Sequence, residues 1–560
     1  MKDDDNKLDC NNFFAAKTRE DVAKLLGIQE KSLRYFLYKR RPENMYTIFE
    51  MPKKNGKSRT ISAPQEELKQ IQRKLAIVLS NVYIPKVCAY GFITNKSILE
   101  NATKHTGRKI LLNIDLKDFF TQIHFGRIRG MLMKKPYALG EEAATTIAQI
   151  ACFNGVLPQG APSSPILTNM ICAPLDNHLM RLAKQCGCTY TRYADDITFS
   201  TYKKEIPIDI VYERNSEVCL GKKLLSILKQ HSFEVNAEKI TLRTNYDRQE
   251  VTGLTVNAFP NIRRSYTKQL RAILHHCDKM GVYDTAKEFV KKGFCKSSEI
   301  VALIDNPDKQ DVVEDWFRKV LVGKLHFIKQ IKGEKNLTFL ALAQKMNKVF
   351  NSDIFDISEL DKLSAIANNC TFVLEEETQD TVCQGSGFYV PGYGLFTSYH
   401  VTQSGGFFKV YEHTLYQEKY CSIIAKEMNE QSCDETIDYA LYNFLITSQP
   451  ITLAIGDSAK LNIGDTVITI GYPNHVKGNS PYIQECKITS KKTYLGAVFY
   501  TVSGRIVHGA SGGLVLDKDY NVVGIIKGGI VTLSDDDFNE NQGFIPMHIV
   551  LADIQNKQAE

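Results

Sequence analysis

The feature that most constrains the fold of this chain is a change of pattern near residue 371. Upstream of it, apolar residues recur at helical spacing, as in residues 18–40, and residues 265–331 lack the alternation typical of strands. Downstream of it, short apolar runs are punctuated by glycine, which is typical of an all-β sandwich or barrel. Because 560 residues are too many for one hydrophobic core, we expect a multidomain protein of roughly three or four folding units.

Charge divides the chain at the same place. Of the 70 Lys+Arg and 63 Asp+Glu residues, 12 and 22 lie in residues 371–560, so this part carries a net charge of −10 and the part before it +17. A basic surface attracts the phosphate backbone of nucleic acids, and an acidic surface does not. The first part is therefore expected to bind nucleic acid.

Cysteine usage and the first residues indicate a cytoplasmic location. The 14 cysteines are scattered without a paired C-x-x-C spacing, so we interpret them as reduced thiols. Residues 1–5 lack the apolar segment of a secretory signal. The sequence also contains no apolar run of about 18 residues, so we expect no membrane partner.

Three aspartates lie at the ends of predicted strands in the basic part. Asp115 follows the apolar run of residues 110–114, and Asp195 and Asp196 lie in the turn of a hairpin predicted for residues 189–200. Two adjacent aspartates in a turn, taken alone, are commonly only a solvated surface feature. If the two strands are neighbours, however, the three carboxylates can hold the two Mg²⁺ ions that nucleotide transfer to a 3′ end uses.

Three segments, in this order, resemble successive motifs of reverse transcriptases. They are Asn113–Phe120 (NIDLKDFF), Leu157–Pro165 (LPQGAPSSP) and Tyr193–Asp196 (YADD). The resemblance implies an α+β right-hand polymerase, with fingers and palm in residues 1–260 and a helical thumb in residues 261–335. It also implies a site for two Mg²⁺ ions at Asp115, Leu116, Asp195 and Asp196.

The same resemblance implies which residues bind the incoming dNTP. Arg59, with Lys53 or Lys54 nearby, matches the cations of the fingers that grip the triphosphate, and forked guanidinium donors suit phosphate. Phe120 matches the aromatic residue that crowds a nucleotide 2′-OH, and Gln159 matches a residue that lines the nucleotide pocket. Lys239 matches a lysine sometimes given the role of acid for pyrophosphate departure, with an ordinary surface cation as the alternative.

Two further patterns are typical of retron reverse transcriptases, a bacterial group. Residues 101–105 (NATKH) fit N-A-x-x-H, and residues 251–253 fit V-T-G. The resemblance implies a dedicated structured noncoding RNA that is both template and partner, a 2′-OH of which primes a branched RNA–DNA product (msDNA). The residues implied in RNA binding are Asn101, His105, Val251, Thr252, Gly253, Arg263 and Arg264. A solvated helix face is the alternative for the arginines, and a reverse transcriptase of another bacterial group is the alternative for the family.

A serine between glycines marks the acidic part of the chain. Ser511 in Gly509–Gly513 (GASGG) follows His400, at the end of a predicted strand, and Asp438, at the start of an apolar run. Acyl transfer by serine needs a base, a group that orients the base, and donors for the oxyanion. The order His, Asp, Ser resembles chymotrypsin-like (trypsin-like) serine proteases, which implies an all-β double barrel in residues 371–560.

By this resemblance Ser511 is the nucleophile, His400 the general base and Asp438 its orienter, with Asp434 as a rival orienter. The backbone N–H groups of Gly509 and Ser511 would form the oxyanion hole, and no cofactor is needed. Arg505 matches the base of the specificity pocket, where it would favour an acidic P1 residue unless it points to solvent.

The two resemblances together predict a retron reverse transcriptase fused to a serine protease effector that cuts an unknown protein in anti-phage defence. Residues 336–370 are interpreted as a helical connector. The alternative keeps the polymerase and makes the second domain a binding module that retains only the protease fold.

Overall fold

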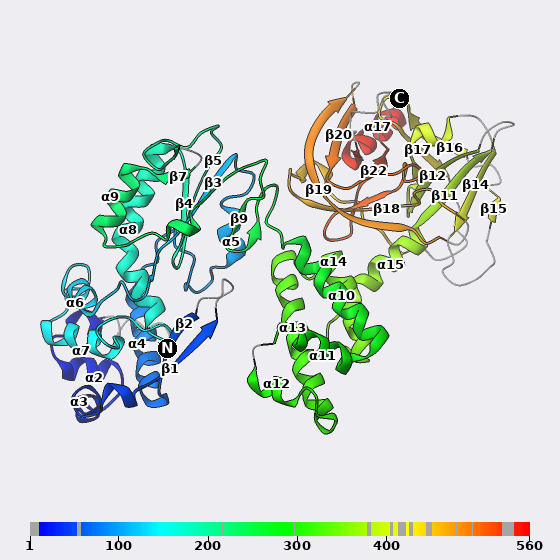
Figure 1. Ribbon diagram of the computed structural model, residues 1–560. Coiled ribbons are helices and arrows are strands. Elements are labelled where there is room, and N and C mark those ends of the chain that lie inside the picture. Colours follow the sequence, from blue (N-terminus) through cyan, green and yellow to red (C-terminus); the bar gives the residue numbers. More distant parts are fainter. Residues whose placement is uncertain are drawn as a thin grey trace. The chain divides into compact units, whose positions relative to one another are not determined.

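The computed structural model of the chain falls into two compact units, Met1–Arg264 and Ser265–Glu560, each with its own hydrophobic core (Figure 1). It describes residues 11–52, 58–214, 217–295, 297–377, 382–403, 407–412, 422–424, 429–443, 451–476, 479–494, 497–528 and 542–559.

Helices dominate the first part of the N-terminal unit. Thr18 caps the start of α2, because the Thr18 hydroxyl accepts a hydrogen bond from the Asp21 amide and the Asp21 carboxylate accepts one from the Thr18 amide. A two-stranded antiparallel hairpin of β1 (Tyr46–Pro52) and β2 (Ser58–Pro64) follows. The helices are α2 (Arg19–Leu25), α3 (Glu30–Tyr38), α4 (Glu66–Val82), α6 (Phe125–Met133) and α7 (Glu141–Ala151).

A four-stranded antiparallel sheet of order β4-β5-β3-β8 forms the centre of this unit. The helices α8 (Ser164–Cys186) and α9 (Lys222–Gln230) lie beside it (Figure 1). Buried side chains of these helices and of the strands belong to one core, because alternate strand residues such as Leu112 and Ile114 face the helices. The strands are β3 (Ile110–Asp115), β4 (Thr189–Tyr193), β5 (Asp196–Thr201) and β8 (Thr241–Thr244).

Two small hairpins complete the N-terminal unit. The strands β6 (Val211–Arg214) and β7 (Glu217–Leu220) form one of them. The other pairs β9 (Glu250–Val251) with β10 (Leu254–Thr255), and both of its strands contact α5 (Ile98–Thr103). The turn of the second hairpin holds Thr252 and Gly253 with φ of 48° and 82°, the left-handed values that a two-residue turn uses.

The C-terminal unit begins with helices that continue to residue 370. Asn336 starts α14, because its side-chain oxygen accepts a hydrogen bond from the Phe339 amide. The helices are α10 (Arg264–Met280), which crosses the unit boundary, α11 (Val282–Lys291), α12 (Ser298–Leu303), α13 (Gln310–Lys332), α14 (Leu337–Phe350) and α15 (Ser358–Cys370).

The last two of these helices are joined to the β-rich part of the unit. The Glu485 carboxylate accepts hydrogen bonds from the Asn336 side chain at 2.6 and 2.8 Å and from the Leu337 amide at 3.1 Å. Buried residues of α15, Leu363 and Cys370 among them, share a core with strand residues such as Phe388. The segment 336–370, predicted as a helical connector, therefore packs on the β-rich part.

Two sheets make up the β-rich part. The first has the order β15-β14-β11-β12-β13-β17-β16, and the second is a closed barrel, β18-β19-β20-β23-β22-β21, followed by α17 (Met547–Ala559). The first contains β11 (Thr371–Glu377), β12 (Val382–Val390), β13 (Gly394–Thr397), β14 (Phe407–Glu412), β15 (Ser422–Ile424), β16 (Asn429–Asp434) and β17 (Tyr439–Asn443). The second contains β18 (Thr466–Gly471), β19 (Tyr482–Tyr494), β20 (Ala497–Val502), β21 (Leu514–Leu516), β22 (Val522–Lys527) and β23 (Gly543–Pro546).

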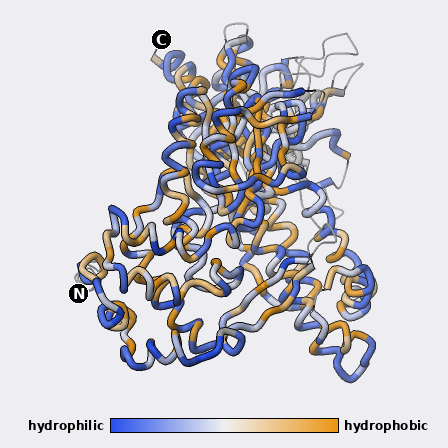
Figure 2. Tube along the Cα trace, turned by 60° about the vertical axis from the view of Figure 1, so that its left-hand side comes forward, coloured by the Kyte–Doolittle hydropathy of each residue, from blue (hydrophilic) through white to orange (hydrophobic). Residues whose placement is uncertain are grey.

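The observed architecture confirms the predicted fold class, a mixed helix-and-sheet part followed by an all-β part with a barrel. Figure 2 shows apolar and polar residues alternating at short intervals along the tube. Within the described residues, no helix combines the length and the apolar character that crossing a bilayer requires.

Candidate active sites

The antiparallel pairing of β3 with β5 brings the three predicted aspartates of the basic part together. In the strand register Asp115 lies opposite Asp196, and the Leu116 amide donates a hydrogen bond to the Asp195 carbonyl at 3.0 Å. The turn before Asp195 is fixed by Ala194, which adopts a left-handed φ of 56°. The Ala194 backbone also packs closely on Gly91, where an added Cβ would lie 2.4 Å from the Ala194 amide nitrogen.

These carboxylates disfavour one another's ionisation. Burial, and then the nearby Asp115, raise the pKa of Asp195. Burial, and then Asp195 and Asp115, raise the pKa of Asp196 to about 7. Such crowded, partly desolvated carboxylates fit a divalent cation, because its charge offsets their repulsion and hard oxygen donors suit Mg²⁺.

A lysine is bound to this group of carboxylates. The Lys239 ammonium lies 2.8 Å from Asp115 Oδ2 in an ion pair.

Within the described residues, no three His, Cys, Asp or Glu side chains are grouped closely enough to hold a metal ion as they stand.

The residues predicted to bind the dNTP lie on the elements around the aspartates. The positive charge of Arg59, on β2, acts to lower the pKa of Asp195, so its guanidinium is within electrostatic range. The loop that carries Gln159 is joined to the same strand, because the Gln159 carbonyl accepts a hydrogen bond from the Ser62 amide at 2.8 Å. Phe120 is half-buried and contacts Phe92, with ring centroids 6.4 Å apart. The predicted Lys53 lies outside the described residues.

The first sheet of the β-rich part supplies two of the predicted protease residues. His400 lies in α16 (Tyr399–Thr402), just after β13, and Asp438 precedes β17. The Asp438 carboxylate accepts a hydrogen bond from the His400 amide at 3.0 Å and lies 2.9 Å from His400 Nδ1 through each oxygen. The rival Asp434 instead forms an ion pair with Lys557 at 3.3 Å. The geometry therefore favours Asp438 as the orienter.

The closed barrel supplies Ser511, which is only 8% exposed. The Ser511 carbonyl accepts a hydrogen bond from the Ser386 amide at 2.8 Å, and the Ser386 hydroxyl donates to the Gly509 carbonyl at 2.6 Å. These bonds join the serine loop to the first sheet. In the described part of the chain, the amides of Gly509 and Ser511 donate to no protein acceptor, as an oxyanion hole requires.

The Ser511 hydroxyl faces a backbone donor in this structure. Its Oγ accepts a hydrogen bond from the Gly528 amide at 3.2 Å, and among the described residues no hydrogen bond joins it to His400. Beside it lies a small cavity of about 20 Å³, lined by Arg505, Gln484 and Ala510 among others. Among the described residues, this space has room for about one water molecule.

Known proteins resemble both parts of the chain. The family model described as reverse transcriptase (RNA-dependent DNA polymerase) matches residues 51–258, and the trypsin-like peptidase domain model matches residues 385–525. The Mx162 retron reverse transcriptase of Myxococcus xanthus is 36% identical over 48% of this chain and 61% of its own length. The Ec86 retron reverse transcriptase of Escherichia coli is 32% identical over 46% of this chain and 77% of its own length.

The chain belongs to the retron reverse transcriptase family. It spans less than two thirds of the length of the Mx162 relative, and the same holds for the Mx65 retron reverse transcriptase of Myxococcus xanthus, at 62%.

Solved protease structures resemble about a third of this chain. One is the HtrA-type protease AlgW with a tripeptide, 22% identical over 35% of this chain and 62% of that chain, with a TM-score of 0.29. Another is the active form of the Rv3671c protease from M. tuberculosis, 21% identical over 36% of this chain and 87% of that chain, with a TM-score of 0.28.

Three residues of the two retron patterns are buried. Asn101, His105 and Val251 are at most 1% exposed. His105 bridges two strands of the sheet, with Nδ1 2.7 Å from Ser200 Oγ and Nε2 2.7 Å from Thr191 Oγ1. For these three residues, RNA binding stays a prediction, and the observed contacts of His105 are within the sheet.

The other predicted RNA-binding residues lie nearer the surface. Thr252 and Gly253 form the β9–β10 turn, and the Thr252 hydroxyl donates to the Ile98 carbonyl at 3.3 Å. Arg263 is half-exposed and forms an ion pair with Glu250, and Arg264 begins α10.

Sequence reasoning missed a buried ion pair beneath the aspartate turn. Arg192 and Asp176 are both fully buried and lie 2.8 Å apart. Arg192 also donates hydrogen bonds to the Ala194 carbonyl at 3.2 Å and to the Asn169 side chain at 3.1 Å. The only sequence signal is an arginine inside an otherwise buried strand, which without the fold does not reveal its partner.

Proposed function

We propose that this chain is an RNA-directed DNA polymerase that makes a branched RNA–DNA from a structured noncoding RNA, and that its second part is a serine protease effector in anti-phage defence. The observation that carries this proposal is the presence of two separate catalytic constellations in one chain, each on its own fold. DNA synthesis and proteolysis do not need each other, so their fusion in one chain is explained if one activity controls the other.

In the proposed polymerase, Asp115, Asp195, Asp196 and the Leu116 carbonyl would hold Mg²⁺, which when bound supplies charge stabilisation at the reacting phosphate. Arg59 neutralises the triphosphate. Gln159 and Phe120 border the sugar and base, and Phe120 excludes a 2′-OH by steric crowding. Lys239 is close enough to Asp115 to position that carboxylate and to hold a proton near the leaving pyrophosphate.

In the proposed protease, Ser511 Oγ attacks the peptide carbonyl while His400 Nε2 accepts its proton, and His400 later donates that proton to the leaving amine. Asp438 holds the His400 ring by the Nδ1 contact. The Gly509 and Ser511 amides are available to the oxyanion. Before this attack, the hydrogen bond from the Gly528 amide to the Ser511 hydroxyl must break.

This last requirement supports control of the protease. A serine that is bound to a backbone amide, beside a cavity with room for about one water, describes a resting site that needs rearrangement before cleavage. The reverse-transcribed DNA is the proposed controlling partner, and it either holds the protease at rest or triggers it.

The test expresses the full chain with its cognate RNA and compares wild type, Asp195→Asn and Ser511→Ala. We expect msDNA in wild type and Ser511→Ala but not in Asp195→Asn, and we expect phage resistance only in wild type. Intact protection in Ser511→Ala would remove the effector role. Absence of branched RNA–DNA from wild-type cells would remove the retron role.

A fluorophosphonate probe separates an active protease from a binding module that retains only the fold. Labelling of Ser511 in the wild-type chain, and none in Ser511→Ala, supports the protease. No labelling of folded wild-type chain, with or without msDNA, supports the binding module.

A further inference from the structure

Asp438 has a backbone conformation that needs support from its neighbours. Its φ of 72° lies in the left-handed region, which is uncommon for a residue that carries a side chain. A residue in such a region keeps its conformation only where the surrounding structure fixes it. The Asp438 side chain is also only 6% exposed. The groups that hold the segments before and after Asp438 therefore decide where its carboxylate lies relative to His400.

The segment before Asp438 is a turn that Asp434 closes. The Asp438 amide donates to the Asp434 carbonyl at 2.8 Å, and the Ile437 amide donates to the Asp434 carboxylate at 2.8 Å. Lys557 holds the start of this turn, because its ammonium donates to the Cys433 carbonyl at 2.6 Å and lies 3.3 Å from the Asp434 carboxylate. The rival orienter predicted from sequence thus shapes the turn that leads to Asp438.

The residue after Asp438 is held from the same helix, α17. Tyr439 begins β17 and is fully buried. Its hydroxyl donates to the Asp553 carboxylate at 2.6 Å, so it accepts a hydrogen bond from the Ser432 hydroxyl at 2.7 Å. Asp553 and Lys557 lie one turn apart on α17 and form an ion pair at 2.7 Å. One pair of side chains therefore holds the chain on both sides of Asp438.

The helix α17 is itself fixed to the β-rich part. Its buried residues belong to the core that also contains Tyr439; they are Met547, Val550 and Ile554. Burial acts to lower the pKa of Lys557, but the hydrogen bond with Asp553 outweighs it and raises that pKa above its usual value. Lys557 therefore stays charged at neutral pH, and its contacts with the two aspartates stay ionic.

We propose that α17 positions the orienter of the protease site, with Lys557 and Asp553 as the positioning residues. This inference rests on the proposed protease function. Without these contacts the turn loosens, and the Asp438 oxygens no longer stay 2.9 Å from His400 Nδ1. A small displacement of a group that orients the base slows acyl transfer. Among the described residues, neither positioning residue forms a hydrogen bond with His400 or Ser511, so each acts through Asp438.

A double-mutant cycle on the labelling of Ser511 tests this role. The full chain with its cognate RNA is treated with a fluorophosphonate well below the Tm of each variant. We expect Lys557→Met to slow labelling about tenfold in the Asp438 chain and by less than about twofold in an Asp438→Asn chain. The Asp438→Asn chain should retain slow labelling, because the oxyanion donors remain. An equal loss in both backgrounds would assign Lys557 a purely structural role and overturn the proposal.

A milder variant, Tyr439→Phe, tests the other side of Asp438. It should fold, because it removes only the hydroxyl and keeps the ring in the core. We expect labelling several-fold slower than wild type in the Asp438 chain and unchanged in the Asp438→Asn chain. A wild-type rate in Tyr439→Phe would overturn the role given to Asp553.

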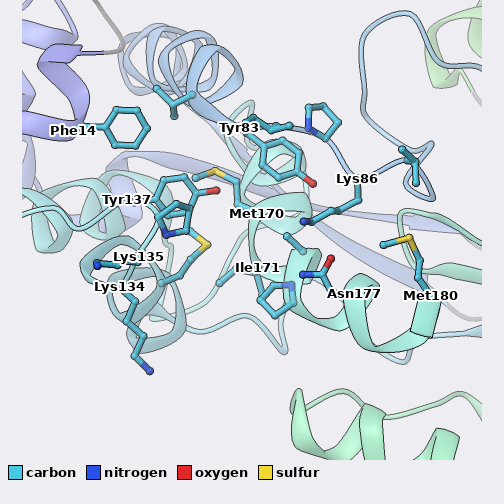
Figure 3. Close-up of a pocket in the computed structure, with 18 residues that line it drawn as sticks. Phe14, Tyr83, Lys86, Lys134, Lys135, Tyr137, Met170, Ile171, Asn177 and Met180 are labelled. Atoms are coloured by element: carbon cyan, nitrogen blue, oxygen red, sulfur yellow. The ribbon is translucent and has the colours of Figure 1, made fainter. Parts of the chain in front are cut away.

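Two other lysine variants serve as controls. Lys460→Met breaks an exposed ion pair with Asp457 at 2.8 Å in the same unit. Lys86→Met removes a half-buried lysine that lines a groove of about 770 Å³ in the N-terminal unit (Figure 3). Both should label at the wild-type rate, because among the described residues neither side chain forms a hydrogen bond or ion pair with residues 433–439 or with α17.

The outcomes separate this inference from the proposed function. Labelling of the wild-type chain, with an equal rate in Lys557→Met, would overturn positioning by α17 and leave the protease in place. No labelling of the folded wild-type chain, with or without msDNA, would remove the protease function and this inference with it.

Discussion

Lys527 lies 3.3 Å from Asp438, the carboxylate that holds His400. Its side chain is 22% exposed and that of Asp438 is 6% exposed, so the pair lies largely out of water. Asp438 therefore shares its negative charge between an imidazole and an ammonium. Lys527 is the last residue of β22, and Gly528, which follows it, donates to the Ser511 hydroxyl. One strand end thus contacts both the proposed orienter, Asp438, and the proposed nucleophile, Ser511.

Replacing Lys527 by methionine should slow the labelling of Ser511. Without the ammonium, the largely buried Asp438 carboxylate loses one of its two charged partners and holds the His400 ring less firmly, so the labelling rate should fall several-fold. The measurement is the rate of fluorophosphonate labelling at neutral pH. The exposed Lys518→Met variant serves as control and should follow wild type. An unchanged rate in folded Lys527→Met would contradict this role of the lysine.

Asp196→Asn should stabilise the chain at neutral pH in the absence of divalent cations. The folded pKa of about 7 lies above the ordinary value of 3.8, so the stability that protonation provides is present at low pH and is lost as pH rises from about 4 to 7. Because part of the Asp196 side chain also reaches solvent, screening reduces the effect to a Tm increase of a few degrees. The measurement is the Tm of wild type and of Asp196→Asn in EDTA between about pH 4 and 7. A wild-type Tm that does not fall relative to that of the variant as pH rises would contradict this prediction.

Asp176→Asn should weaken the fold and the polymerase together. It leaves the Arg192 charge buried without its partner, which costs about 3–5 kcal/mol, or about 10 °C in Tm. DNA synthesis should fall at temperatures where the variant is still folded, because Arg192 also holds the Ala194 carbonyl. The matched control is Asp209→Asn at the exposed Lys223 pair, for which both Tm and synthesis should remain close to wild type.

His105→Ala should lower stability without lowering the RNA affinity of the folded chain. Burial lowers the pKa of His105 to about 3, so the folded state holds a neutral ring and loses stability as pH falls from about 6.5 toward 3. The variant should remove that pH dependence and reduce Tm, since two hydrogen bonds between strands are lost. Binding of cognate RNA, measured well below Tm, should be unchanged; a large loss there would restore the predicted RNA contact.

The meeting of the three aspartates could be predicted from sequence because their motifs are local. A strand that ends in Asp115 and a hairpin with Asp195 and Asp196 in its turn leave few pairings, and the register of β3 with β5 brings them together. The choice of Asp438 over Asp434 also rested on a local feature, the apolar run that became β17.

Contacts between distant segments could not be predicted in this way. Arg192 and Asp176 meet only because α8 packs on the sheet, and Lys527 meets Asp438 only because two sheets face each other. His105 shows a second limit of sequence analysis, in which the motif is recognised but the contacts of its side chain are not. Its motif is typical of the family, but a pattern shared by relatives does not reveal whether a side chain faces RNA or the interior.

The central claim, that one half of the chain controls the other, is tested most directly by labelling Ser511 in cells that contain the cognate RNA. The rate of fluorophosphonate labelling is compared between the wild-type chain, which makes DNA, and Asp195→Asn, which does not, with Ser511→Ala as the blank. The account predicts clearly different rates in the two chains. Equal rates, with both chains folded and RNA-bound, would contradict it.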